Sequence, residues 1–375
     1  MKDLHQLKRG DSVLIFGAGQ FAQAVASALG HLGIEVAAFI SSEPTRETLS
    51  GRPIKTWSSL QGISNLKTLP LLCGIFNRDH AYQDLDAIAR SHGFEAMLMP
   101  WQYYPALAEW LGWRYWLTRH PETLAPIENW PTELHHVHAL LADEESRELL
   151  RRIVAFRAGM DLSFSKVRSS EAQYFNALTL AAAAKRDDLV YFDVGAYDGD
   201  TLREISSQVK LSRAMLFEPC PNNLQRLKGA VETYISEHPD TEVEIMPLAL
   251  SNCNGHRVLA GQGEAATVST DAPDITQAQE LLVHTARADD LYPSLCVDFV
   301  KIDAEGTDLS CIQGMPQLLS RSQPAVAATV YHRDLDLIDI PLALANILGI
   351  KGYRYHLRQH HFNSFDCVFY AVPKT

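Results

Sequence analysis

Residues 190–201 read Val-Tyr-Phe-Asp-Val-Gly-Ala-Tyr-Asp-Gly-Asp-Thr, an apolar strand pattern that leads directly into a turn with two glycines. The strand ends at Val194, and Gly195 and Gly199 remove side chains from the turn, so a ligand can approach the backbone there. A helix is expected after the turn, and its N-terminus offers unpaired N–H groups. This order of strand, glycine turn and helix predicts a parallel α/β domain with a ligand at the carboxyl edge of the sheet.

Two acidic side chains in this stretch indicate what kind of ligand the turn accepts. Asp193 lies near the end of the strand, and Asp198 lies in the turn. A dinucleotide loop needs amide donors that face two phosphates, and carboxylates at that place would repel the pyrophosphate. An amino-acid cofactor with an ammonium group instead benefits from a nearby anion. The turn therefore favours an ammonium-bearing cofactor over a dinucleotide.

Strand and helix patterns alternate through the whole C-terminal half of the chain. The seven strand candidates are residues 189–194, 213–218, 243–248, 297–303, 325–331, 353–358 and 366–372. The first five fit parallel strands, and the last two fit a closing antiparallel pair. The predicted fold class is therefore α/β, with a doubly wound, mixed, seven-stranded sheet.

Acidic side chains follow several of these strands. Glu218 follows the second strand, at the place where an acid binds ribose hydroxyls in nucleotide sites. The third strand leads into residues 248–251, Leu-Ala-Leu-Ser, which are small and apolar and suit the face of an adenine. Asp303 ends the fourth strand, and Glu305 follows it. Because ligands of open parallel sheets bind beyond the carboxyl ends of the strands, we expect these acids to converge with Asp193.

Several motifs in this half resemble the FkbM-type methyltransferase family. They are DVGAYDGDT (193–201), FEPCPNN (217–223), VKIDAEGTDLSCIQGM (300–315), LRQHH (357–361) and VFYAVP (368–373). The resemblance spans roughly residues 189–372. It implies a class I methyltransferase fold that binds S-adenosylmethionine and transfers the methyl group to a hydroxyl, commonly on a sugar of a glycan or natural product.

The resemblance also implies how the cofactor lies along the strand ends. The methionine end would lie on the turn after the first strand, the ribose on Glu218 and the adenine under Ala249. The residues expected to bind the cofactor are Asp193, Gly195, Ala196, Asp198, Gly199, Thr201, Glu218, Pro219, Ala249 and Asp303. Asp303 and Glu305 would form the floor of the methyl-transfer site.

The chain departs from the family after the fifth strand. Many members have an acid there, whereas this chain reads Thr-Val-Tyr-His-Arg-Asp over residues 329–334. We expect Asp303, Glu305 and His332 to be catalytic, with Asp303 or His332 taking the proton from the acceptor hydroxyl. A neutral His332 with a carboxylate orienting its ring would serve as that base. We expect no metal; ligation of Mg²⁺ or Mn²⁺ by Asp303, His332 and Asp334 is the competing interpretation, and a purely structural His332 is the third.

The N-terminal segment contains a second glycine turn. Residues 17–22, Gly-Ala-Gly-Gln-Phe-Ala, follow the strand pattern 12–16 and nearly match a dinucleotide fingerprint. The next strand ends in Ser41 and Ser42 without the acid that would bind ribose, so we expect a scaffold or binding module without redox chemistry. NADP binding through these serines and Arg46 stays open.

The chain is long enough for two domains, and its composition is typical of a folded globular protein. We predict a Rossmann-like nucleotide- or sugar-binding-type domain over residues 1–118, a helical connector over 119–180 and the methyltransferase domain over 181–375. The 375 residues carry a net charge of −12, so we expect no nucleic acid partner. No apolar run spans a bilayer, and the six cysteines form no CxxC pair, so we expect a cytoplasmic protein.

The predicted function is that of an S-adenosylmethionine-dependent O-methyltransferase whose partner is a small-molecule or glycan acceptor. Two other functions are weighed against it. An NADP-dependent sugar-nucleotide oxidoreductase would use the N-terminal turn, but the chain lacks a Tyr-x-x-x-Lys pair. A non-catalytic cofactor-binding scaffold is disfavoured by the complete series of acids. Whether the protein forms a homodimer is left open.

Overall fold

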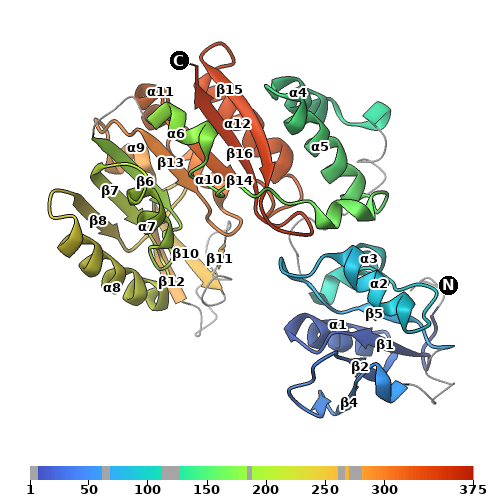
Figure 1. Ribbon diagram of the computed structural model, residues 1–375. Coiled ribbons are helices and arrows are strands. Elements are labelled where there is room, and N and C mark those ends of the chain that lie inside the picture. The colour runs from blue at the N-terminus through green and yellow to red at the C-terminus, as the bar shows by residue number, and fades with distance from the viewer. Residues whose placement is uncertain are drawn as a thin grey trace. The chain divides into compact units, whose positions relative to one another are not determined.

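The computed structural model describes residues 7–60, 68–111, 127–183, 188–260, 267–269 and 281–374. The chain divides into two compact units (Figure 1). The smaller unit comprises residues 1–130, 151–168 and 361–365, and the larger comprises 131–150, 169–360 and 366–375. Of the described helices, none is long and apolar enough to cross a membrane.

The larger unit contains a seven-stranded sheet in the order β15-β16-β14-β13-β6-β7-β8. Its strands are β6 Leu189–Val194, β7 Leu211–Phe217, β8 Glu242–Met246, β13 Phe299–Ile302, β14 Ala325–Thr329, β15 Tyr353–Gln359 and β16 Cys367–Pro373. All neighbours from β8 to β14 pair in parallel, and β16 pairs antiparallel with both β14 and β15. This confirms the predicted mixed, seven-stranded, class I methyltransferase-type sheet. The chain leaves β6 toward β7 and later returns to β13 on the other side, so the order reverses between β6 and β13, where open α/β sheets bind ligands.

Apolar side chains cover both faces of this sheet. On one face, Tyr191 of β6 packs on Phe175 and Phe299, with ring centroids 5.8 and 6.0 Å apart. On the other face, Phe192 packs on Phe217 at 4.6 Å. Successive residues of a strand point to opposite faces, so this alternation requires helices on both sides. The helices of the unit that follow β6 are α7 Asp200–Ser206, α8 Pro221–Glu237, α9 Ala288–Leu291, α10 Asp308–Gln313, α11 Pro316–Ser322 and α12 Asp336–Leu348, and α6 Ala177–Ala183 precedes β6.

A second, four-stranded sheet lies between β8 and β13 in sequence and was not predicted. Its order is β11-β10-β12-β9, and the strands are β9 Ala249–Leu250, β10 Gly255–Ala260, β11 Thr267–Val268 and β12 Leu281–Ala286. Ala249 is buried there in an apolar cluster with Cys220, Leu259, Val268 and Val283. Cys220 lies two residues after Glu218, so this cluster borders the end of β7.

The smaller unit contains a five-stranded sheet in the order β3-β4-β2-β1-β5. Its elements are β1 Ser12–Phe16, α1 Gln20–His31, β2 Glu35–Ile40, β3 Thr48–Leu49, β4 Arg52–Lys55, β5 Leu71–Cys73, α2 Tyr82–Ser91 and α3 Pro100–Leu111. The β1-α1-β2 unit confirms the predicted Rossmann-like beginning. Beside β5, Leu98 forms an isolated parallel bridge with Leu72 and is not part of a strand.

Residues 134–158 of the predicted helical connector have helical spacing, with a capped helix start at Asp143, and they form two helices, α4 Thr132–Leu140 and α5 Glu144–Arg157. The break has a physical cause: Leu141 forms a parallel bridge with Tyr355, and Asp143 accepts a hydrogen bond from the Ser146 N–H at 2.7 Å, which begins the new helix. The predicted boundary at residue 118 lies outside the described residues. The three-part division of the chain therefore stays a prediction.

Candidate active site

The turn after β6 is fixed by the two strands on either side of it. Gly195 has φ +81°, and a Cβ atom there would lie 1.9 Å from the carbonyl oxygen of Asp303. Only glycine fits such a contact. The N–H groups of Gly195 and Ala196 both donate to the carbonyl oxygen of Phe217 at 3.0 Å. The turn therefore lies in close contact with the carboxyl ends of both β7 and β13.

The remaining turn residues direct the chain into α7. Gly199 has φ +83° and precedes the first residue of the helix, and Tyr197 also has a positive φ of +47°. Asp198 is partly exposed and lies 3.6 Å from the guanidinium of Arg203. This conformation leaves the backbone of the turn close to the ends of the neighbouring strands, where the sequence predicts the cofactor.

A buried ion pair between Lys301 and Asp193 supports the turn. The Nζ of Lys301 lies 3.2 Å from a carboxylate oxygen of Asp193, and both side chains are almost fully buried. The Thr201 hydroxyl donates to Asp193 at 2.5 Å, and Lys301 donates to the carbonyl oxygen of Gly195 at 2.5 Å. Burial lowers the pKa of Lys301, but the carboxylates of Asp193 and Asp303 outweigh burial and raise it, so the ammonium stays charged. The observed partners of Asp193 are thus Thr201 and Lys301, and the sequence does not show the pairing with Lys301.

Glu218, the predicted ribose acid, is buried directly after β7. Its carboxylate accepts hydrogen bonds from the N–H of Cys220 at 2.7 Å, the N–H of Tyr197 at 3.1 Å and the amide of Asn223 at 3.3 Å. Burial raises the pKa of this carboxyl, and the hydrogen bonds oppose that rise. A carboxylate has about four acceptor positions, so three donors fix its orientation and leave capacity for a hydroxyl. Pro219, half-buried, follows it before α8 begins.

The three residues predicted to be catalytic lie together. Asp303 and Glu305 follow β13, and His332 follows β14. The Nε2 of His332 lies 3.4 Å from Asp303 Oδ1 and 3.6 Å from Glu305 Oε2. The other oxygen of Asp303 accepts a hydrogen bond from the Tyr174 hydroxyl at 2.7 Å. The cluster of Asp303, Glu305 and His332, called the acceptor cluster below, thus lies at the carboxyl ends of two neighbouring strands.

A fourth residue, Asp308 at the start of α10, was missed by sequence reasoning. Its Oδ2 lies 2.9 Å from the Nδ1 of His332, and the carboxylate also accepts from the N–H groups of Ala304 and Gly306 and from the Thr329 hydroxyl. The only signal in the sequence is an acid at a helix start, which is usual for capping. In the fold this acid orients the imidazole.

The charges around His332 decide its protonation. Burial lowers the pKa of His332, but the carboxylates of Asp308 and Glu305 outweigh burial and raise it well above 6.5. Burial raises the pKa of Glu305 to about 8. In the protein as described, His332 is therefore protonated at neutral pH, unlike the neutral base expected from the sequence. Asp303 is then the better placed proton acceptor.

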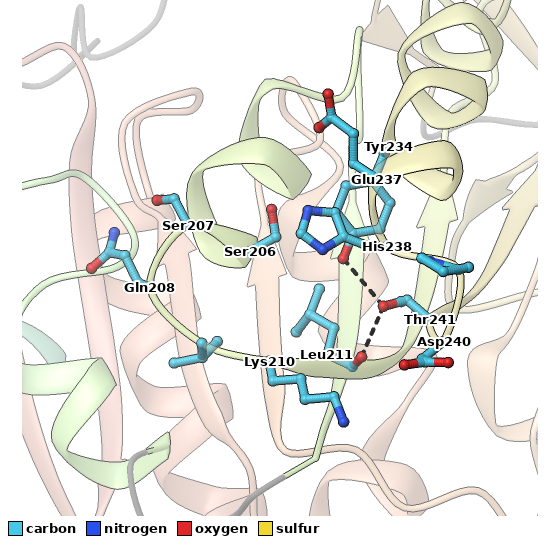
Figure 2. Close-up of a pocket in the computed structure, with 12 residues that line it drawn as sticks. Ser206, Ser207, Gln208, Lys210, Leu211, Tyr234, Glu237, His238, Asp240 and Thr241 are labelled. Carbon is cyan, nitrogen blue, oxygen red and sulfur yellow. Dashed lines mark hydrogen bonds between the residues drawn. The ribbon is translucent and has the colours of Figure 1, made fainter.

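A cavity of about 400 Å³ lies at the other edge of the same sheet. Figure 2 shows the residues that line it. Leu211, the first residue of β7, and the last residues of α7 and α8 line it, and Thr241 Oγ1 donates to the Leu211 carbonyl at 2.9 Å. Glu218 follows the opposite end of β7. None of the predicted site residues lines this cavity, and ligands of parallel sheets bind at the carboxyl edge. We therefore do not assign the cofactor to it.

The glycine turn of the smaller unit is also formed as expected. Gly17 has φ +124°, and a Cβ there would lie 2.7 Å from the carbonyl oxygen of Gly74. Arg46, the residue considered for a 2′-phosphate, donates to the carbonyl oxygen of Ala18 at 2.6 Å.

Comparisons with known proteins agree with this geometry. Residues 193–366 match the sequence model of the methyltransferase FkbM domain. The crystal structure of a methyltransferase FkbM from Methylobacillus flagellatus KT is similar, with 21% identity, a TM-score of 0.74 and coverage of 97% of this chain and 91% of that one.

Two further solved structures align over about half of the chain. A precorrin-6y C5,15-methyltransferase from Geobacter metallireducens GS-15 has 16% identity and a TM-score of 0.31 over 55% of this chain and 95% of its own. An rRNA methylase from Streptococcus thermophilus has 12% identity and a TM-score of 0.31 over 52% and 92%. No curated protein matches the sequence. Residues 193–366 therefore match the methyltransferase FkbM domain in sequence, and the chain has the fold of a solved FkbM methyltransferase.

Proposed function

We propose that this protein is an S-adenosylmethionine-dependent O-methyltransferase that acts on a hydroxyl of a sugar, glycan or related natural product. The observation that carries the proposal is the convergence of the glycine turn, the ribose acid Glu218 and the acceptor cluster at one edge of one sheet. A methyl donor and an acceptor hydroxyl need adjoining sites, and these strand ends provide both.

The residues present fit S-adenosylmethionine. The turn from Gly195 to Gly199 has a backbone from which bulky side chains are removed, and Glu218 retains acceptor capacity for ribose hydroxyls. Ala249 is buried beside Cys220, so an apolar surface suited to an adenine adjoins the acid. When bound, the cofactor supplies a methyl group on a positively charged sulfur. The protein has to bring an acceptor oxygen into line with it, which is mainly a positioning task.

The acceptor cluster supplies the polar groups for that task. Asp303 receives a hydrogen bond from Tyr174, which holds one carboxylate oxygen in place and leaves the other facing His332 and the acceptor. Asp303 accepts the hydroxyl proton. His332, oriented by Asp308, holds that carboxylate by charge. The neighbouring carboxyl groups of Asp303 and Glu305 also support a polyhydroxylated acceptor, because the oxygens of each can accept from a hydroxyl.

The experiment is transfer of a labelled methyl group from S-adenosylmethionine to a panel of glycans and sugar nucleotides, with product masses determined. We expect one panel member to gain a methyl group on oxygen, and Asp303→Asn to lose turnover while it retains S-adenosylhomocysteine binding. Methylation on nitrogen or carbon, or full turnover in Asp303→Asn, would contradict the proposal.

We propose the cytoplasm as the compartment. The six cysteines are all free thiols, and four of them are buried, as expected in a reducing compartment. Alkylation of the unreduced protein after denaturation tests this, since every thiol should react.

A further inference from the structure

We propose that the acceptor cluster, formed by Asp303, Glu305 and His332, binds a divalent transition-metal ion, with Mn²⁺ as the best match. Each of the three residues offers one ligand atom, and these atoms all lie within 4.8 Å of one another. The binding of the ion stands on this geometry alone. Its role, to hold the acceptor oxygen beside Asp303, rests on the proposed function.

The separations within the cluster suit a shared ion. The Nε2 of His332 lies 3.4 Å from Asp303 and 3.6 Å from Glu305. Two ligand atoms on one ion lie about 3.0–3.4 Å apart when each bond is about 2.1 Å long. Both distances from His332 are close to this range, and the two carboxylate oxygens lie within 4.8 Å of each other.

The second observation is the state of the His332 side chain. It is 2% exposed, and its Nε2 atom has no hydrogen-bond partner among the described residues. That nitrogen faces two carboxylate oxygens, so a divalent cation that displaces the proton of the imidazole would contact all three groups. The Nδ1 atom is 2.9 Å from Asp308, and such a carboxylate behind the ring is the usual outer partner of a metal-bound imidazole.

The buried carboxyl groups around His332 also favour the binding of a cation. Asp308 and Asp336 add two buried carboxyl groups around the same imidazole. The buried ammonium of Lys301 is already paired with Asp193. Buried charges are stable only when they are paired or bound to a metal, so a divalent ion would neutralise much of this excess.

A neighbouring group, Asp308, His332 and Asp336, has a similar composition but is less suited. There the His332 Nδ1 is already hydrogen-bonded to Asp308, and Asp336 accepts from the N–H of Arg333 at 2.7 Å. The ligand set of the acceptor cluster is one imidazole and two carboxylates. Mg²⁺ prefers oxygen ligands throughout, whereas Mn²⁺ accepts carboxylates readily and tolerates an imidazole.

The test uses the full chain, freed of metal by a chelator and titrated with MnCl₂ alone. Calorimetry and the electron paramagnetic resonance signal of free Mn²⁺ measure the binding. We expect one ion per chain. Glu305→Gln and His332→Ala should abolish or strongly weaken the affinity, and Asp308→Asn should weaken it about 10–100-fold through loss of the outer partner. Asp334→Asn is the matched control, because Asp334 lies two residues from His332 outside the cluster and should leave the affinity unchanged.

Two results would overturn the metal site: no Mn²⁺ binding by the unaltered protein, or unchanged affinity in a folded Glu305→Gln variant. A titration with S-adenosylhomocysteine on the same samples separates this inference from the proposed function. If the protein binds S-adenosylhomocysteine but does not bind Mn²⁺, the metal site is refuted and the proposed function is not. If the protein binds Mn²⁺ but does not bind S-adenosylhomocysteine, the metal site is supported. That result also counts against the proposal that the strand ends bind a methyl donor.

Discussion

The replacement Lys301→Met removes one partner of the buried ion pair under the glycine turn. The side chain of Lys301 is 3% exposed and that of Asp193 is fully buried, so Asp193 would be left as an uncompensated charge. Breaking a buried pair from one side costs about 3–5 kcal/mol, which for a domain of this size corresponds to a fall in melting temperature of about 6–20 °C. We expect the affinity for S-adenosylhomocysteine to fall too, because Lys301 also holds the Gly195 carbonyl.

The double variant Asp193→Leu with Lys301→Met tests the reason for that loss. It removes both charges, so it should lose much less stability than the two single losses added together. The matched control is Lys210→Met, which breaks the exposed pair with Asp188 and should cost less than about 1 kcal/mol. Hydrogen exchange of peptides from β6 and β13 under increasing urea measures the loss in the larger unit separately from the smaller one. A loss below 1 kcal/mol in Lys301→Met, or additive losses in the double variant, would refute the reasoning.

Three further predictions follow from single contacts. Gly195→Ala should cost at least about 1–3 kcal/mol and abolish S-adenosylhomocysteine binding, as seen by thermal shift and calorimetry, because the added Cβ meets the Asp303 carbonyl at 1.9 Å with φ at +81°. Burial alone would raise the pKa of Asp143. Its hydrogen bonds, of which the one from Arg358 has the largest effect, outweigh burial and hold the pKa well below its usual range. The pKa of Asp143 is thus lower in the folded state than in the unfolded state, where it is about 3.9. Asp143 therefore stabilises the fold at a pH above about 3.9, and this contribution is lost as the pH falls below that value toward the pKa of the folded state. The free energy of unfolding of the unaltered protein, measured from pH 7 to pH 3, should show this loss. Asp143→Asn should have a free energy of unfolding lower by about 1–3 kcal/mol at pH 7 and should lack this part of the pH dependence. NADH should show no saturable fluorescence change, since β2 is followed by Ser41 and Ser42 rather than by a ribose-binding acid and Arg46 is bonded to the Ala18 carbonyl of the glycine turn.

Much of the larger unit could be predicted from sequence because its strands are short apolar runs with a glycine or an acid directly after them. Parallel strands are buried on both faces, and their patterns stand out from the amphipathic helices between them. The convergence of Glu218, Asp303 and Glu305 required only the rule that carboxyl ends meet at one edge. The four-stranded sheet could not be predicted in this way, because β9 and β11 have two residues each and β9 pairs with β12, which is far away along the chain.

The partners within the site depend on tertiary structure. Lys301 lies opposite Asp193 only because β13 pairs with β6 in one particular register, and the two residues are far apart in the chain. Asp308 is ordinary for the first turn of a helix until β14 and α10 place it beside His332. In both cases the residue type was visible in the sequence, and the contact that gives it a role was not.

The most direct test of the central claim compares two glutamates at opposite edges of the same sheet. The claim is that S-adenosylmethionine binds at the carboxyl edge, on the turn after β6 and on Glu218. Calorimetric titration of the full chain with S-adenosylhomocysteine should show one site. Glu218→Gln should weaken it by about 1–3 kcal/mol, because a charge-assisted contact to ribose is lost. Glu237→Gln, in the lining of the cavity of Figure 2, should leave the affinity unchanged. Unchanged affinity in Glu218→Gln together with weakened binding in Glu237→Gln would contradict the account.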